Sequence, residues 1–225
     1  MLVLVVDSST PAVTAALAEV SVDGVALRAH RCTVDARAHG ELLAPQVDAV
    51  LADAGAQAAD LTAVVAGLGP GPFTGLRVGL VTAATMGQVL GIPTYGVCSL
   101  DGVGHPAAAG EPVLAATDAR RREIYWAVYD GAGQRIVGPD VDGPAVVAER
   151  ARGLAVTVAV GDGAQRYADV LGLPVRDEPR YPDPAALARL AAERIRAGAA
   201  TEPLTPLYLR RPDAVAATGR KPVLP

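Results

Sequence analysis

Residues 67–91 read GLGPGPFTGLRVGLVTAATMGQVLG, and this stretch decides the fold. It opens as a Gly/Pro-rich turn and continues as an apolar helix in which Arg77 is the single charged residue. A membrane-spanning helix is excluded, because glycines weaken a span and polar side chains interrupt the apolar run. The interrupting residues are Thr74, Arg77, Thr82, Thr85 and Gln88. The remaining interpretations are a nucleotide-binding loop, a core helix and a surface for a partner protein.

The nucleotide interpretation fails on the motif and on its chemistry. A P-loop requires Gly-Lys, but Gly75 is followed by Leu76. A dinucleotide fingerprint requires a third glycine where Thr74 stands. Phosphate-binding turns use backbone N–H groups, and Pro70 and Pro72 have none. The stretch is therefore interpreted as a helix of the core or of an interface.

Small residues recur at every fourth position of this helix and so share one face. They are Gly75, Gly79, Ala83 and Gly87. A glycine inside a helix costs roughly 0.5–1 kcal/mol relative to alanine, so the stripe predicts close approach of another backbone. A helix that is apolar nearly all round is covered on both sides. One side would face a sheet, and either the chain's own second lobe or a second protein would cover the other.

The rest of the chain alternates strands and helices. Strands are expected at residues 2–7, 13–22, 25–34, 61–69 and 92–100 of the first half. Asp23-Gly24 predicts a hairpin between the second and third of these strands. A first helix is expected over residues 39–54, with Pro45 inside it. A Gly/Ala/Pro-rich passage at residues 101–112 predicts a boundary, after which strands and helices repeat. An amphipathic helix near residues 182–198 has Asp183 as its predicted cap.

Composition excludes several classes of protein. A chain of 225 residues suffices for one large domain or two small ones. The net charge of -4 gives no basis for a self-sufficient nucleic-acid surface. The N-terminal apolar run ends at Asp7 and lacks a basic segment, so neither a signal peptide nor a membrane anchor is expected. Cys32 and Cys98 share no motif and are expected to be reduced thiols of a cytoplasmic protein.

Several motifs in order resemble those of the TsaB (YeaZ) family. They are VVDSST, HGELLAPQV, GLGPGPFTGLRVG, DARRREIYWAVY, GDGA and PLYLR. The match extends from Leu2 to about Arg211, and Pro72 stands where the family commonly has Ser. The resemblance implies an α/β fold of two actin/Hsp70-like lobes, each a mixed sheet with flanking helices. The expected division is residues 1–105, residues 106–211 and a flexible tail over residues 212–225.

The resemblance also implies a function. TsaB proteins are subunits of the bacterial machinery that forms N6-threonylcarbamoyladenosine at position 37 of tRNAs that read ANN codons. They are paralogues of the catalytic subunit TsaD, pair with it, are joined by the ATPase TsaE, and form homodimers when alone. A non-catalytic scaffold subunit is therefore expected, which contacts tRNA through the complex.

In this family the first two helices form the dimer surface. Carried over to this chain, the contact residues are His39, Glu41, Leu42, Pro45, Gly71, Phe73, Thr74, Gly75, Arg77 and Val78. The exposed stripe inferred from the residues adds Leu76 and Gly79.

Catalytic and metal-binding roles receive little support from the residues. TsaD-type proteins bind metal through two His four residues apart on a helix, whereas His30, His39 and His105 are not so spaced. No metal is therefore expected. A vestigial nucleotide turn is expected at Asp7, Ser8 and Thr10, where actin-type ATPases hold phosphate and magnesium. No cofactor is expected to bind tightly, and ATP or ADP would bind only weakly in the assembled complex.

Two other features leave alternatives open. The charged cluster from Asp118 to Glu123 could touch tRNA or a partner, or form a solvated hairpin turn. Asp162, between two glycines, resembles a second phosphate turn. The alternative functions are an independent actin-type sugar or acyl-phosphate kinase and a regulatory factor that binds other proteins.

Overall fold

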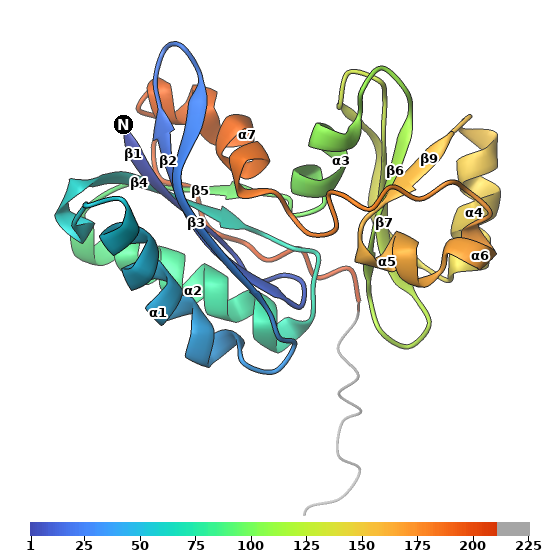
Figure 1. The fold of residues 1–225 in the computed structure, drawn as a ribbon, viewed down its shortest axis with the longest axis horizontal. Coiled ribbons are helices and arrows are strands. Elements are labelled where there is room, and N and C mark those ends of the chain that lie inside the picture. The colour runs from blue at the N-terminus through green and yellow to red at the C-terminus, as the bar shows by residue number, and fades with distance from the viewer. Residues whose placement is uncertain (211–225) are drawn as a thin grey trace, which may run out of the picture.

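The computed structural model describes residues 1–210, which form two lobes, each built on a mixed β-sheet (Figure 1). The predicted α/β class is confirmed, and the predicted tail over residues 212–225 lies outside the described residues. The first sheet has the strand order β3-β2-β1-β4-β5, with β1 antiparallel to β2 and parallel to β4. Its strands are β1 (Leu2–Asp7), β2 (Ala12–Val20), β3 (Val25–Val34), β4 (Leu61–Gly67) and β5 (Thr94–Val97).

Helices cover both faces of the first sheet (Figure 1). They are α1 (His39–Asp53) and α2 (Phe73–Leu90) on one face and α7 (Pro184–Arg196) on the other; a 3-10 turn (Ala58–Asp60) precedes β4. Leu4 and Val6 share a core cluster with α1 and α2, whereas Val3 and Val5 share one with α7. Successive strand residues point to opposite faces, so a strand covered on both faces is apolar at every position. This explains the uninterrupted apolar run in β1.

The second lobe repeats this arrangement with the strand order β8-β7-β6-β9. Its elements are β6 (Val113–Asp118), β7 (Ile124–Tyr129), β8 (Arg135–Asp142), β9 (Val158–Val160), α3 (Asp101–Ala107), α4 (Pro144–Gly153), α5 (Asp162–Arg166) and α6 (Ala168–Leu171). Helix α3 packs on one face, and α4 and α6 pack on the other. Trp126 is fully buried in the second of these clusters, and its indole N–H donates to Asp142 at 3.1 Å.

The predicted lobe boundaries need correction. Helix α7 lies within the segment assigned to the second lobe, yet Leu187, Ala191 and Ile195 belong to the core of the first sheet. The physical reason is that this face of the sheet would otherwise be exposed, and α7 carries an apolar stripe to cover it. Conversely, Val103 of α3 lies before the predicted boundary but belongs to the core of the second lobe.

The chain therefore crosses between the lobes three times. It leaves the first lobe after β5, returns at α7, and crosses again in an extended C-terminal segment, residues 199–210. In this segment, Leu204 packs in the first lobe and Leu209 in the second. The Leu207 N–H donates to the Leu68 carbonyl at 2.8 Å. The lobes are thus joined by packing as well as by the backbone.

Helix α3 occupies part of the passage interpreted as a boundary. Its glycines make room for large side chains of its neighbours. A Cβ at Gly104 would lie 2.0 Å from Cε2 of Tyr129, and one at Gly102 would lie 2.9 Å from Cδ2 of Leu187. The glycines of α3 therefore allow close packing against Tyr129 within the second lobe and against Leu187 of the first lobe's core.

Leu187→Ala tests whether α7 seals the first lobe. Removing this fully buried side chain should lower the free energy of unfolding by about 2–5 kcal/mol, because it leaves a cavity. Denaturant unfolding followed by circular dichroism measures the change. The matched control is Val22→Ala at a side chain that is 90% exposed, which should change stability little. A cost below about 1 kcal/mol for Leu187→Ala would contradict the assigned packing.

Candidate protein-interaction site

The site is organised around the turn between β1 and β2, which contacts the start of α2. The Ser8 hydroxyl donates to the carbonyl oxygen of Gly75 at 2.8 Å and accepts from the N–H of Gly79 at 2.8 Å. These two backbone groups are an i, i+4 pair, which an α-helix normally joins to each other. The serine oxygen therefore binds directly to the backbone of α2.

Gly75 and Gly79 of α2, and Gly71 just before it, face this turn. A Cβ at Gly79 would lie 2.6 Å from Ser8 Oγ, and a Cβ at Gly75 would lie 3.1 Å from His39 Nε2. A Cβ at Gly71 would lie 2.2 Å from the Ser9 carbonyl oxygen. The predicted close approach of a second backbone is thus confirmed, but that backbone is the chain's own β1–β2 turn.

Five predicted contact residues are consequently buried inside the lobe. They are His39, Gly71, Gly75, Leu76 and Gly79. Leu76 is fully buried in the core cluster beneath the helices. The inference that the stripe containing Leu76 and Gly79 faces outward is wrong, because the spacing of small residues does not reveal which backbone approaches.

His39 holds the same turn from α1. Its ring is buried, and Nε2 lies 2.8 Å from the carbonyl oxygen of Thr10. The Thr10 side chain in turn accepts from the N–H of Ala12 at 3.2 Å. His39 therefore links α1 to the β1–β2 turn.

Asp7 completes this internal network. One carboxylate oxygen accepts from the N–H and the hydroxyl of Ser9, at 2.9 and 2.8 Å, and the other accepts from the Ser99 hydroxyl. Burial raises the pKa of Asp7, while the hydrogen bonds from Ser99 and Ser9 oppose that shift. At position 67, a Cβ would lie 1.7 Å from the Asp7 carboxylate. The oxygen atoms at the predicted nucleotide turn are thus engaged by the chain itself.

The opposite face of α1 and α2 is uncovered within the described residues. Seven of the predicted contact residues lie on it, exposed or half-buried. They are Glu41, Leu42, Pro45, Phe73, Thr74, Arg77 and Val78. The two helices pack against each other and carry this face on the outer side of the first lobe (Figure 1). We call it the α1–α2 face.

The α1–α2 face extends further along α2 than the sequence analysis proposed. Val81 is 62% exposed and Val89 is 76% exposed, and Thr82 and Thr85 lie between them. These positions continue the helical spacing of Thr74 and Val78, which was the signal that could have identified them. None of these added side chains is charged, so the described part of the face is uncharged along most of α2.

An aromatic cluster marks one end of the α1–α2 face. The Phe73 and Tyr208 rings are stacked with centroids 5.2 Å apart. The Arg77 guanidinium lies 3.7 Å from the Phe73 centroid, and its Nε donates to the Tyr208 hydroxyl at 2.8 Å. The C-terminal segment thereby binds the first turn of α2.

The second predicted phosphate turn is also tightly packed. Asp162 accepts from the N–H of Asp118 at 3.3 Å, and a Cβ at Gly161 would lie 2.2 Å from the Ala116 carbonyl oxygen. Burial raises the pKa of Asp162 to about 6, and the nearby Asp118 carboxylate adds to the shift, while hydrogen bonds from backbone N–H groups oppose it. This turn therefore connects β6 to α5 within the second lobe.

Within residues 1–210, no cluster of three or more His, Cys, Asp or Glu side chains is arranged to bind a metal ion. In the same range, the longest helix is α2, with 18 residues, and neither it nor any other helix has the length and hydropathy needed to cross a bilayer.

Comparisons with known proteins define the class. The sequence model of the TsaD family, described as tRNA N6-adenosine threonylcarbamoyltransferase, matches residues 33–205. The chain is 50% identical over 212 residues to an uncharacterized protein of Mycobacterium tuberculosis (strain H37Rv), covering 94% of this chain and 93% of the relative. It is 33% identical over 224 residues to the tRNA threonylcarbamoyladenosine biosynthesis protein TsaB of Escherichia coli K12, covering 93% and 95%.

Solved structures agree with this class. YeaZ from Pseudomonas aeruginosa is similar with a TM-score of 0.73 and 25% identity, covering 92% of this chain and 100% of that chain. A second structure from that organism, described as similar to peptidase YeaZ, has a TM-score of 0.76 and 28% identity, covering 93% and 99%. The fold and the sequence therefore place the chain among TsaD-related proteins. Within them, it belongs to the TsaB (YeaZ) family.

Gly79→Ala tests the contact between Ser8 and α2. The new Cβ should destabilise the chain by about 1–3 kcal/mol, because it would overlap Ser8 Oγ. In a Ser8→Ala background the same change should be neutral or favourable by up to about 1 kcal/mol, because alanine is the better helix former. Chemical denaturation of the parent, the two single variants and the double variant measures the coupling free energy between positions 8 and 79. Gly40→Ala, where a Cβ meets no atom within 4 Å, is the control. Equal effects in both backgrounds would disprove the proposed contact.

Asp162→Asn tests the buried carboxyl of the second lobe. The folded-state pKa of about 6 exceeds the ordinary carboxyl pKa of 3.8, so this residue's contribution to stability is present below about pH 4 and is lost as pH rises through 6. Relative to Asp162→Asn, the parent chain should lose roughly 2–3 kcal/mol of stability between pH 4 and pH 7. Urea unfolding at a series of pH values provides the comparison. If the free energy of unfolding changed with pH in the same way for both proteins, the raised pKa of Asp162 would be contradicted.

Proposed function

We propose that the chain is a non-catalytic partner subunit in the formation of N6-threonylcarbamoyladenosine in tRNA. Membership of the TsaB (YeaZ) family supports this proposal, as does the name of its E. coli relative, a tRNA threonylcarbamoyladenosine biosynthesis protein. The partner would be a TsaD-like threonylcarbamoyltransferase, joined by a TsaE-like ATPase. In the absence of that partner, two copies of the chain would pair through the same face.

The observation that carries the proposal is the uncovered outer face of α1 and α2, which is uncharged along α2 after Arg77. Exposed Phe73, Val81 and Val89 lie along α2, with half-buried Leu42 beside them on α1. Contiguous apolar surface on a soluble protein is typical of a protein-interaction site. Glu41 and Arg77 carry charge near one end of this face, where they could fix the orientation of a partner.

The internal bonding of the β1–β2 turn supports a non-catalytic role. Asp7 and Ser8 occupy positions that bind phosphate and magnesium in actin-type ATPases, but here their oxygen atoms bind Ser9, Ser99 and α2. A nucleotide at this turn would have to replace buried hydrogen bonds, each net worth about 0.5–1.5 kcal/mol. We infer that no cofactor binds tightly and that ATP or ADP binds weakly, in the assembled complex. Transfer to tRNA would then occur on the partner.

Val81→Glu tests the proposed interface. The side chain is 62% exposed, so the substitution should leave the fold unchanged while placing a charge against an apolar partner surface. Co-purification with the TsaD-like partner should fall at least tenfold, and N6-threonylcarbamoyladenosine in tRNA, measured by nucleoside mass spectrometry, should fall with it.

The matched control is Ile136→Glu, at a 51% exposed position on β8 in the other lobe. This variant should pair and support modification normally. Thermal unfolding of both variants confirms folding. Full-strength pairing by Val81→Glu, or equal losses in the two variants, would refute the proposed interface.

A further inference from the structure

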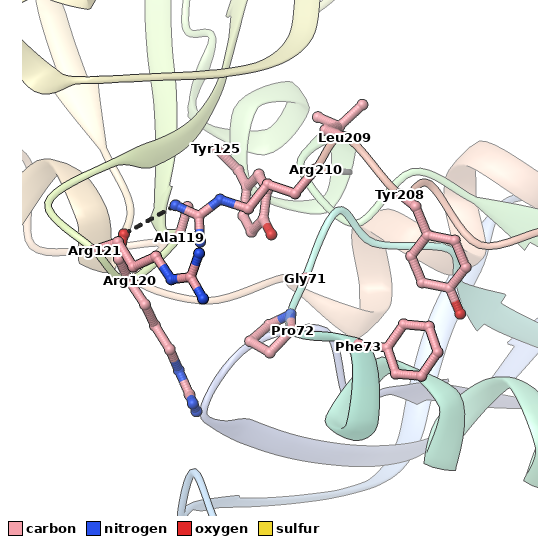
Figure 2. Close-up of a pocket in the computed structure, with 10 residues that line it drawn as sticks. All are labelled: Gly71, Pro72, Phe73, Ala119, Arg120, Arg121, Tyr125, Tyr208, Leu209 and Arg210. Atoms are coloured by element: carbon pink, nitrogen blue, oxygen red, sulfur yellow. Dashed lines mark hydrogen bonds between the residues drawn. The ribbon is translucent and has the colours of Figure 1, made fainter. Parts of the chain in front are cut away.

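A pocket between the lobes adjoins the α1–α2 face and shares Phe73 with it. Its volume is about 770 Å³, within the range typical of ligand sites. Figure 2 shows Arg120, Arg121 and Arg210 on one side, and Pro72, Phe73 and Tyr208 on the other. We call it the arginine pocket.

The charge of the arginine pocket is one-sided. None of the described residues that line it is acidic, and three are arginines. The two carboxylates that flank these arginines in the sequence form ion pairs, Asp118 with Arg166 and Glu123 with Arg210. This local excess of positive charge stands out in a chain whose net charge is -4. It suits a ligand that carries phosphate groups.

Arg120 and Arg121 lie in the turn between β6 and β7, whose backbone conformation directs their side chains toward the pocket. Arg120, Arg121 and Arg122 have φ angles of 60°, 53° and 63°, a conformation uncommon for residues other than glycine. The turn is held by the Asp118 carboxylate, which accepts the Arg120 N–H at 3.2 Å, and by Arg210, which donates to the Arg120 carbonyl at 3.2 Å. Such a conformation costs free energy at each residue, so it persists where the surroundings enforce it.

The other side of the pocket offers aromatic surface. Phe73 is 52% exposed and Tyr208 is 41% exposed, and their rings are already stacked on each other. Arg77 binds both rings, so they are ordered before any ligand arrives. Ordered, exposed rings next to cationic side chains are the elements with which proteins bind single-stranded nucleic acid.

We propose that the arginine pocket binds a single-stranded segment of the tRNA substrate, with phosphates on Arg120 and Arg121 and an unpaired base against Tyr208 and Phe73. This inference rests on the proposed function, because it concerns the same tRNA. Guanidinium groups suit a phosphodiester backbone. The metal of a nucleoside triphosphate is usually held by a carboxylate, and none of the described residues that line the pocket has one.

The experiment is a fluorescence anisotropy titration. The full chain, co-purified with its TsaD-like partner, is titrated into a labelled, unmodified tRNA transcript that reads an ANN codon, at several salt concentrations. Arg120→Gln combined with Arg121→Gln should weaken binding roughly tenfold at 0.1 M salt. It should also reduce the slope of log affinity against log salt by about 0.7 for each lost phosphate contact. Arg28→Gln combined with Arg152→Gln, at exposed positions elsewhere, is the charge-matched control and should change neither.

Tyr208 separates base stacking from charge. Tyr208→Ala should weaken binding roughly fivefold or more without changing the salt slope, whereas Tyr208→Phe, which keeps the ring, should bind within about twofold of the parent. Thermal unfolding shows whether each variant is folded. Equal affinity and equal slope for the Arg120/Arg121 variant and the parent would overturn the proposal.

Two other outcomes would also overturn the proposal. If the Arg120/Arg121 variant loses ATP binding but keeps its affinity for tRNA, the pocket serves a free nucleotide and the proposal is wrong. If it loses only co-purification with the partner, the pocket is a protein contact and the proposal is again wrong. If the proposed function is wrong, the parent chain itself would not pair with the TsaD-like partner, which distinguishes that failure from failure of the pocket proposal. The same titration on the chain alone would then still test the pocket.

Discussion

The contact between the Ser8 hydroxyl and the backbone of α2 is the constraint on which the first lobe depends. It joins the β1–β2 turn to the carbonyl of Gly75 and the N–H of Gly79 without room for a Cβ at position 79. Because α2 is held at this distance, Leu76 and Leu80 enter the core beneath the helices. The same contact determines which side of α2 remains outside.

The two sides of α2 therefore have different roles. The glycine side serves the internal packing of the lobe, and the outer side carries Phe73, Val81 and Val89. Phe73 also belongs to the rim of the arginine pocket. A protein on the α1–α2 face and an RNA strand in the pocket would consequently meet at the first turn of α2. In a TsaB-like subunit, this places the proposed partner and the proposed substrate side by side.

The sequence was sufficient to predict much of the fold. Apolar runs and turn residues identified the N-terminal meander, and helical spacing identified α1, α2 and α7. The side chain of Asp183 accepts from the N–H groups of Ala185 and Ala186, as expected of a helix cap. Tertiary pairing could not be predicted, because the apolar stripe of α7 would fit either sheet. Helix α3 was missed for a related reason, since its glycines signal a turn until the Tyr129 and Leu187 side chains beside them are known.

The candidate site likewise has features that the sequence predicted and features that it did not. The spacing of small residues indicated close approach but not which backbone approaches, and it did not identify Ser8. His39 was assigned to the contact surface from the family resemblance, whereas its ring binds the Thr10 carbonyl in the interior. Leu42, Thr74 and Val78, which the family resemblance assigned to a contact surface, do lie outward on α1 and α2.

The return of α7 to the first sheet has a consequence for synthesis of the protein on the ribosome. Five residues of α7 belong to a core cluster that also contains β1 residues, yet α7 ends at Arg196. During translation the first sheet therefore emerges with one apolar face bare, and the second lobe must be made before that face can be covered. The N-terminal lobe is first to leave the exit tunnel but cannot be first to complete its fold, and a nascent chain stalled between the lobes would offer chaperones an open hydrophobic surface.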